Sequence, residues 1–462
     1  MKQTTYATLE ELRLALHGVT VPFHCEGTFV AQKPVTLVFK NQTTFTVVRA
    51  AATYEQQNEL RPLLKHCETA PFGAGKQTRY DRNVRDAFQL KAAGGALAVS
   101  NFDPETAGIL KAIQRELVPR DPNPISAELY ALNVYTEGGH FAKHKDTPRG
   151  GDMLGTLVVC LPSQFRRGRL MLSHRGIVRR LDWGAEIQSQ TEPNQLHWAA
   201  FFGDVDHEIE DVWSGARVTL AYLLRRGEGS NPGRDSADDH DLEPRVQAAW
   251  QGLLADRSFL PEGGTLAYPC GHLYHQDARL QQEPSAITLQ AMPMLKGRDQ
   301  LVATSALAVG LEVTFHPYLF ENAADSTWQL DRFPTRKEQS RLGKRMDDDR
   351  LNRILPIRES VKEDGDVGLT WLDPQPSNDR ATRRINADDE FEVAAAAHLH
   401  ACEYCPWGYF GNEASDSDFY IYAALHIEIP PLGEGPRPAG KAPKRSPAKR
   451  KPAKRKRGQS GD

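Results

Sequence analysis

The sequence predicts a mainly β fold with flanking helices, an α+β chain with a barrel or jelly roll at its centre. Between residues 126 and 226 several short apolar segments are separated by Gly, Pro, Asp and Asn turns. Successive short strands of this kind favour a barrel or jelly roll. With 40% hydrophobic and 25% charged residues, the composition is that of a folded protein and excludes a fibrous or wholly disordered chain.

The elements follow in chain order. Runs rich in β-branched and aromatic residues predict strands at 27–30, 35–40 and 44–48, and a helical pattern follows at 54–66. We expect residues 1–125 to form an N-terminal β/α region that packs on a central domain at 126–226. The strands predicted in that domain are 127–135, 155–162, 168–176, 197–203 and 216–224.

A second domain is predicted after a polar linker. Residues 227–245 are rich in Gly, Asp and Ser, as in an exposed linker. Residues 246–430 then read as a C-terminal α/β extension, with helical patterns at 246–256 and 305–310 and a last strand at 419–429. In that strand one parity is apolar and the other is mixed, which predicts a half-buried strand. Whether this region forms a second jelly roll is left open by the sequence.

Charge is distributed unevenly along the 462 residues. Residues 1–430 hold 46 basic and 58 acidic side chains, whereas 437–457 carry 11 basic and no acidic ones. Residues 431–462 therefore predict a disordered basic tail, suited to nuclear import or to nonspecific contact with nucleic acid. Six scattered cysteines argue against a disulfide framework, and no apolar run could span a membrane. We expect an intracellular protein, nuclear in a eukaryotic host and otherwise cytoplasmic.

A metal site is predicted around residue 145. His144 and Asp146 are two positions apart, so on an extended backbone their side chains leave the same face and can meet one cation. The missing ligand would be a histidine on a neighbouring strand, and His207 follows 61 residues after Asp146. Two imidazoles and one carboxylate leave open positions on Fe(II) for a chelating cosubstrate and dioxygen.

A second candidate residue follows His207 by ten positions. Arg217 shares a strand face with Thr219 and Ala221, so a lone cation lies among small residues. A planar guanidinium can hold a carboxylate through two parallel hydrogen bonds, and the Thr219 hydroxyl can add a third. We therefore expect an anionic group opposite Arg217.

These motifs together resemble the catalytic domain of the prolyl 4-hydroxylase-like Fe(II)/2-oxoglutarate dioxygenases. The matching segments are Tyr-x-x-Gly-Gly-x-Phe-x-x-His-x-Asp at 135–146, Gly-Arg-Leu at 168–170, Asp-x-x-His-Glu-Ile at 204–209 and Gly-x-Arg-Val-Thr-Leu at 215–220. Segments 70–75, 128–130, 146–149 and 295–297 are also similar to a largely fungal group of long dioxygenase-like proteins.

The resemblance implies a double-stranded β-helix, the jelly roll of that family. It implies that His144, Asp146 and His207 bind iron, that Arg217 and Thr219 hold the distal carboxylate of 2-oxoglutarate, and that Tyr135 contacts the cosubstrate. Cys160 departs from the pattern, because many prolyl hydroxylases have a tyrosine at this place against the cosubstrate. The implied cofactors are Fe(II), with 2-oxoglutarate and dioxygen as cosubstrates and ascorbate as a candidate reductant.

The implied reaction is hydroxylation of a C–H bond with release of succinate and CO2. A protein or peptide substrate, with prolyl or another side chain as the target, is the first hypothesis. The alternatives are an oxidative demethylase of nucleic acid and a non-catalytic interaction module on the same fold. The basic tail favours the demethylase only weakly, since the folded body is acidic and has no evident basic stripe with stacking aromatics.

Two histidine- and cysteine-containing segments are weaker metal candidates. A zinc site would need a second ligand pair that neither segment supplies at the usual spacing. Their residues are Cys270, His272, His275 and Asp277 in the first, and His398, His400, Cys402 and Cys405 in the second. His140 and His197 lie near the predicted iron site, and we expect structural or pocket-lining roles for both.

Overall fold

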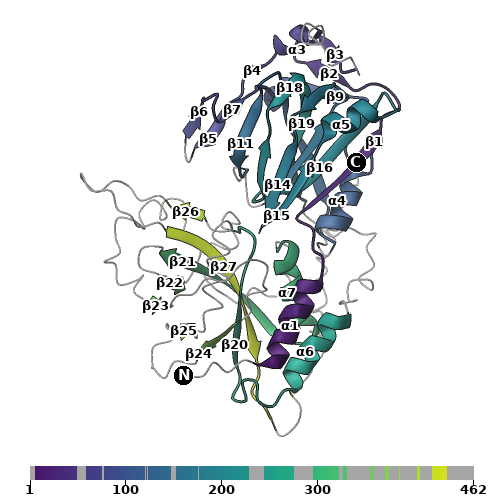
Figure 1. Cartoon of the computed structure of the whole chain (residues 1–462). Helices are drawn as coiled ribbons and strands as arrows, with labels where there is room; N and C mark the ends of the chain where they lie inside the picture. The colour runs from purple at the N-terminus through teal and green to yellow at the C-terminus, as the bar shows by residue number, and fades with distance from the viewer. Residues whose placement is uncertain are drawn as a thin grey trace, which may run out of the picture.

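The computed structural model describes residues 6–48, 59–74, 77–119, 121, 123–146, 152–174, 176–227, 244–274, 295–321, 326–329, 354–356, 370–373, 384–385, 403–405, 419–433 and 437. Two bodies lie one above the other (Figure 1), and each has its own hydrophobic cluster. The first cluster draws on residues 23–224, and the second combines residues 9–16 with 246–429. In chain order, the described residues therefore start in the second body, form the first body and then return to the second.

Helix α1 (Ala7–Gly18) packs against helix α6 (Pro244–Ala255) in the second body. Its buried apolar side chains recur at helical spacing and form one stripe. They are Leu9, Leu12 and Leu16. The predicted N-terminal region thus divides, since α1 belongs with the C-terminal elements and the strands from β1 onward belong to the first body.

A seven-stranded antiparallel sheet forms one layer of the first body, in the order β1-β16-β12-β19-β10-β8-β4. Its strands are β1 (His24–Val30), β4 (Glu68–Thr69), β8 (Phe88–Lys91), β10 (Ile125–Tyr135), β12 (Met153–Cys160), β16 (Gln195–Phe202) and β19 (Arg217–Arg226). Four of the strands predicted between 126 and 226 lie in this sheet, which confirms their positions to within a few residues.

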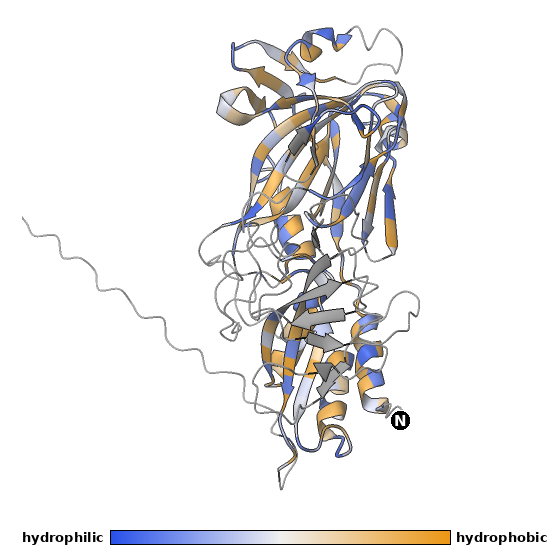
Figure 2. Ribbon diagram, turned by 90° about the vertical axis from the view of Figure 1, so that its left-hand side faces the viewer, coloured by the Kyte–Doolittle hydropathy of each residue, from blue (hydrophilic) through white to orange (hydrophobic). Residues whose placement is uncertain are grey.

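A five-stranded antiparallel sheet forms the second layer, in the order β15-β14-β17-β11-β7. Its strands are β7 (Arg85–Asp86), β11 (His140–His144), β14 (Leu170–His174), β15 (Ile177–Leu181) and β17 (Asp206–Ile209). Apolar side chains of both sheets belong to one cluster, so the two layers share a core. Hydrophobic and hydrophilic positions alternate along the strands (Figure 2), as expected where one face of a strand is buried.

Shorter elements complete the first body. They are β2 (Thr36–Phe39), β3 (Thr44–Thr46), α3 (Arg61–Leu64), β5 (Phe72–Ala74), β6 (Gln77–Arg79), the 3-10 turn η1 (Ala93–Gly95), β9 (Leu97–Ser100), α4 (Ile109–Leu117), β13 (Phe165–Arg167), α5 (Trp183–Ser189) and β18 (Val212–Gly215). Helix α4 packs against β1 and β10 through a buried apolar stripe, because Ile109, Ile113 and Leu117 recur at helical spacing.

The second body is built on an eight-stranded sheet in the order β23-β22-β21-β27-β20-β24-β25, with β26 paired to β27. Its strands are β20 (Gly264–Pro269), β21 (Glu312–Glu321), β22 (Ser326–Gln329), β23 (Ile354–Pro356), β24 (Thr370–Asp373), β25 (Arg384–Ile385), β26 (Glu403–Cys405) and β27 (Phe419–Ile429). Helix α7 (Gly297–Ala308) packs on β21 and β27 and begins eight residues earlier than the predicted helical segment.

Strand β27 has the predicted bounds, but its burial differs from the prediction. Residues 423–427 are buried at both parities, including His426, which is 1% exposed. Burial at both parities means that both faces of this part of β27 are covered, and helix α7 packs on the strand. The mixed parity of its sequence therefore does not mark a solvent-exposed face.

Several predicted features lie outside the described residues. These are most of the linker, at 228–243, the tail beyond residue 433 apart from Arg437, and the start of the helix predicted at 54–66. Within the described residues, no helix combines the length and apolar character needed to span a bilayer.

Candidate metal centre

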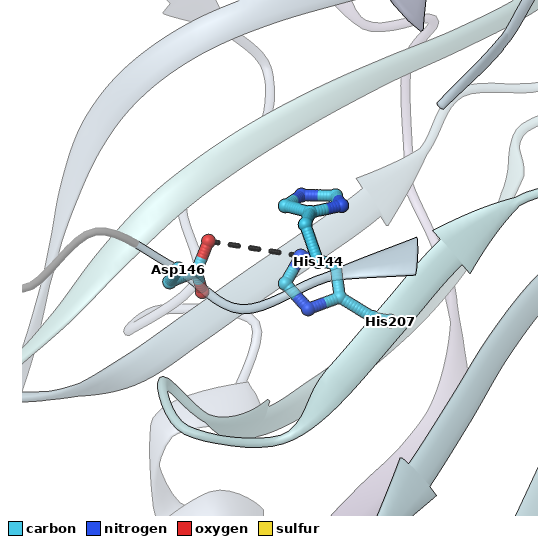
Figure 3. A group of neighbouring side chains, drawn as sticks. All are labelled: His144, Asp146 and His207. Atoms are coloured by element: carbon cyan, nitrogen blue, oxygen red, sulfur yellow. Dashed lines mark ion pairs between the residues drawn. The ribbon is translucent and has the colours of Figure 1, made fainter. Parts of the chain in front are cut away.

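Two adjacent strands and the segment after one of them bring the predicted metal ligands together. His144 ends β11 and lies directly opposite His207 of β17 in the antiparallel register. Asp146 follows two residues after His144, and its Oδ1 is 3.7 Å from Nε2 of His207. One potential ligand atom from each residue lies within 4.8 Å of the others (Figure 3). The structure thus brings together the three predicted ligands, although His144 and His207 are 63 positions apart in the sequence.

Hydrogen bonds to the backbone orient both imidazoles. Nδ1 of His144 donates to the carbonyl of Ala142 at 2.8 Å, and Nδ1 of His207 donates to the carbonyl of Val205 at 3.0 Å. A carbonyl oxygen can only accept, so the proton of each neutral ring lies on Nδ1. Each Nε2 keeps a lone pair for a cation, in the arrangement usual for histidine metal ligands.

The Asp146 carboxylate is oriented in the same way. The Thr156 hydroxyl of β12 donates to Oδ2 at 2.6 Å, and the Asp146 backbone N–H donates to the carbonyl of Gly203 at 3.1 Å. Oδ1 is the oxygen that faces His207. Thr156 therefore links the ligand set, which lies on the small sheet, to the large sheet.

Stacked side chains support His144. The ring of Phe141 lies 3.5 Å from that of His144 between centroids, and the Arg85 guanidinium lies 4.4 Å from the Phe141 centroid. Nη2 of Arg85 donates to Oδ1 of Asn133 at 2.9 Å. Burial, together with the neighbouring His207, lowers the pKa of His144 to about 2. Its imidazole is therefore neutral, which is the form that binds metals.

Arg217 is a buried cation with unused donors. It begins β19 with a side chain 1% exposed, and neither Nε nor Nη2 has a hydrogen-bond acceptor among the described residues. The rings of Tyr135 and Trp183 lie 5.6 Å and 5.3 Å from its guanidinium carbon. Burial lowers the pKa of Arg217, because a charge is costly away from water. Two unpaired donors on a buried guanidinium fit a carboxylate ligand.

Thr219 and Tyr135, the other predicted cosubstrate residues, share a sheet face with Arg217, and so does Cys160. Tyr135 of β10 lies opposite Arg217, and Cys160 of β12 lies opposite Thr219. All four side chains are at least 96% buried. Burial raises the pKa of the Cys160 thiol to about 12, against the opposite influence of Arg217. Cys160 is thus a neutral thiol at the position where many prolyl hydroxylases have a tyrosine.

Strand β12 joins the metal ligands to Arg217. Thr156 and Cys160 are four residues apart on one face, with Thr156 bound to Asp146 and Cys160 beside Thr219. Four residues of extended chain span about 13 Å.

Thr156 and Trp183 belong to the site but were not among the predicted residues. The parity of β12 could have indicated Thr156, since it shares a face with Cys160. No local pattern indicates Trp183, which reaches Arg217 from helix α5. The predicted structural roles of His140 and His197 agree with their contacts. His140 bonds the carbonyls of Gly138 and Asn83, and His197 bonds Gln190 and Glu186.

A second group of two histidines and a carboxylate lies between the two bodies. It consists of His174, Asp204 and His272. His272 was predicted as part of a zinc candidate with Cys270, but its Nδ1 bonds Asp204 of the first body at 2.9 Å. Cys270 belongs to neither group of potential metal ligands among the described residues. His275, Asp277, His398, His400 and Cys402 lie outside the described residues.

Comparison of the sequence with protein-family models and with curated proteins gave no match. Solved structures similar to the chain include a prolyl-4-hydroxylase of Pseudomonas putida, at 13% identity over 47% of this chain and 100% of that one, with a TM-score of 0.28. A 2OG-Fe(II) oxygenase family oxidoreductase of Burkholderia pseudomallei has 13% identity over 50% and 97%, with a TM-score of 0.25.

A third similar structure is a Trichoplax adhaerens prolyl hydroxylase in complex with a peptide fragment of the hypoxia inducible factor oxygen degradation domain. It has 12% identity over 48% of this chain and 94% of that one, with a TM-score of 0.29. These three structures are oxygenases, but their TM-scores below 0.3 describe a distant likeness. The functional argument therefore rests on the side chains of the site itself.

Proposed function

We propose that the chain is an Fe(II)- and 2-oxoglutarate-dependent dioxygenase that hydroxylates a C–H bond. The observation that carries the proposal is the buried Arg217, whose Nε and Nη2 have no acceptor among the described residues. Arg217 lies on β19, which pairs with β12, and Thr156 of β12 binds Asp146. An unpaired buried cation is costly, and a carboxylate ligand would compensate it. Two anchoring points, a metal and a guanidinium, suit a keto acid with a second carboxylate.

The proposal assigns a role to each residue. His144, Asp146 and His207 would hold the metal through Nε2, Oδ1 and Nε2, as their other polar atoms already have partners. Arg217 would bind the distal carboxylate of 2-oxoglutarate, with Thr219 adding a hydrogen bond and Tyr135 limiting where the cosubstrate lies. When bound, Fe(II) with 2-oxoglutarate and dioxygen supplies the oxidation that hydroxylates the substrate and releases succinate and CO2.

The arrangement of the first body supports a double-stranded β-helix as its fold. Two antiparallel sheets share one core, and the ligands lie on β11 and β17 of the smaller sheet. Arg217 lies on β19 of the larger sheet, so the site is formed between the layers. On this proposal the domain comprises residues 126–226 with the N-terminal strands added to both sheets.

For the substrate we propose a protein or peptide side chain, with proline as the first target to test. The buried anchoring groups are committed to metal and cosubstrate, which leaves the substrate to the outer surface of the site. Nuclear localisation and nucleic-acid contact by residues 431–462 remain predictions from the sequence.

An anaerobic binding experiment tests the proposal. Fe(II) and then 2-oxoglutarate are added to the purified protein, and the visible charge-transfer band of the chelate is recorded. We expect a band in the wild type and none in His144→Ala, with Arg217→Met forming the band only at higher 2-oxoglutarate. A wild type that retains Fe(II) but develops no band at any 2-oxoglutarate concentration contradicts the assignment.

A further inference from the structure

Asp204 joins the two bodies at a buried point. It lies in the loop between β16 and β17 of the first body, yet its carboxylate accepts three hydrogen bonds from the second. Lys296 Nζ is 2.9 Å from Oδ1, while His272 Nδ1 and the backbone N–H of Leu273 are 2.9 Å and 3.0 Å from Oδ2. The three ionisable residues are at most 8% exposed.

These contacts favour an ion pair over a metal site, although His174 lies nearby. Lys296 already neutralises Asp204, and a cation would have to displace it. The Nδ1 of His272 is used by Asp204, and its Nε2 faces Gly297 so closely that a Cβ there would come within 2.8 Å. Burial alone would raise the pKa of Asp204, but Lys296 and His272 hold it well below its ordinary value.

The backbone of the same loop contacts the metal ligands. The carbonyl of Gly203 accepts the N–H of Asp146, and the carbonyl of Val205 accepts Nδ1 of His207. Between them, the carbonyl of Asp204 accepts Nζ of Lys145 at 3.0 Å. Three consecutive carbonyls therefore hold the two segments that carry the ligands, while the side chain in the middle is held by the second body.

We propose that Asp204 is a positioning residue through which the C-terminal body orders the metal centre. Lys296, His272 and the Leu273 N–H fix the carboxylate, the carboxylate fixes the loop, and the loop sets the orientation of Asp146 and His207. The role of the C-terminal body is thus to hold two of the three ligands in a binding geometry. The inference rests on the proposed function in that it takes this ligand set as a metal site.

The full chain with Co(II) as the probe tests this role, because bound Co(II) reports affinity and geometry through its visible d–d bands. The variants are Lys296→Met, Asp204→Asn and the two combined. Loss of a partner that orients a ligand costs about 10- to 100-fold in metal affinity. We expect each variant to bind Co(II) at least about tenfold more weakly than the wild type, with altered d–d bands.

The double variant separates positioning from stability. Each single change leaves one buried charge uncompensated and lowers stability, whereas the double change removes both charges and recovers much of it. We expect the double variant to unfold nearer the wild-type temperature but to keep the weakened Co(II) binding. This test also holds if a single variant does not fold.

A matched control removes a buried ion pair elsewhere. The side chains of Asp121 and Arg226 are 0% and 8% exposed, and their Oδ2 and Nε are 2.5 Å apart. Arg226 ends β19, nine residues and about 30 Å along the strand from Arg217. Asp121→Asn should lower the unfolding temperature without changing the Co(II) dissociation constant.

Two outcomes overturn the inference, and they are distinguishable. If the wild type binds Co(II), His207→Ala does not, and the double variant binds like the wild type, the metal centre stands and Asp204 only stabilises the fold. If the wild type and His207→Ala bind Co(II) equally, or neither binds it, the metal centre itself is wrong and the inference falls with it.

Discussion

Replacing Arg217 by methionine should move two properties in opposite directions. In the ligand-free protein its Nε and Nη2 have no acceptor among the described residues, and the side chain is 1% exposed. Each unsatisfied buried donor costs about 1–3 kcal/mol. Removing both donors should gain about 2–6 kcal/mol, and losing the ring contacts of Tyr135 and Trp183 offsets part of this, so the ligand-free variant should be at least as stable as the wild type.

The cosubstrate requirement should rise at the same time. Two hydrogen bonds from a charged donor are worth about 1.5–3 kcal/mol each. Their loss therefore costs at least about 3 kcal/mol, and since about 1.4 kcal/mol corresponds to a tenfold change, half-saturation by 2-oxoglutarate should rise at least about 100-fold. Metal binding should be unaffected, because no ligand residue hydrogen-bonds Arg217 among the described residues.

Urea unfolding of the ligand-free protein and succinate formation at graded 2-oxoglutarate measure the two effects. Arg226→Met is the control, since it breaks the pair with Asp121 and should lower stability while leaving the 2-oxoglutarate requirement unchanged. The reasoning is refuted if Arg217→Met loses as much stability as Arg226→Met, or if its 2-oxoglutarate requirement stays within about twofold of the wild type.

Three further predictions follow from single contacts. Thr156→Val removes the 2.6 Å hydrogen bond to Asp146 and should weaken Co(II) binding about tenfold, whereas Thr156→Ser should retain it; equal affinities in a Co(II) titration would contradict this. Trp183→Leu removes an aromatic face from the buried Arg217, worth about 2 kcal/mol when desolvated; because this contact already exists in the ligand-free protein, urea unfolding should show about that loss of stability, with the 2-oxoglutarate requirement within about twofold of the wild type. The depressed pKa of Asp204 means that its stabilising contribution is complete above the unfolded-state value of about 3.9 and is lost as pH falls through the folded-state value. Urea unfolding between pH 7 and pH 3 should therefore show a steeper acid loss of stability in the wild type than in Asp204→Asn, and parallel curves would remove Asp204 from the acid response.

The parts of the site that the sequence predicted are those encoded in local patterns. His144 and Asp146 share a face because they are two apart on an extended chain, and the parity of β19 isolates Arg217 among small residues. Both predictions use only the alternation of side chains along a strand, which does not depend on the strands beside it. His207 was predicted as the missing histidine ligand and from the motif at 204–209, whereas the register that places it opposite His144 is known only from the structure.

The parts that were missed depend on contacts between distant segments. Asp204 and Lys296 are 92 residues apart, and neither segment has a pattern that indicates the other. The apolar stripe of α1 showed that the helix must pack on something, but not that its partner is α6. For β27 the mixed parity suggested an exposed face, whereas residues 423–427 are buried at both parities. The periodicity of a sequence shows which face of a helix or strand is apolar, but only the tertiary structure shows which segments cover each face.

On the proposed assignment, the charges of the site favour a ligand with a negative group at each end. At the metal end, a divalent cation with one carboxylate and two neutral imidazoles carries a net charge of about +1. At the other end Arg217 carries a second positive charge, buried and with two donors unused. A keto acid with a single carboxylate, such as 2-oxobutanoate, can bind the metal but leaves Arg217 uncompensated.

We therefore expect 2-oxobutanoate to bind the wild type at least about 100-fold more weakly than 2-oxoglutarate, because it lacks the carboxylate that accepts the two hydrogen bonds of Arg217. In Arg217→Met the two acids should bind within about tenfold of each other, because the residue that distinguishes them is gone. Competition of both acids for the anaerobic Fe(II) charge-transfer band measures this directly, and a preference for 2-oxoglutarate that survives in Arg217→Met would mean that another cation holds the distal carboxylate.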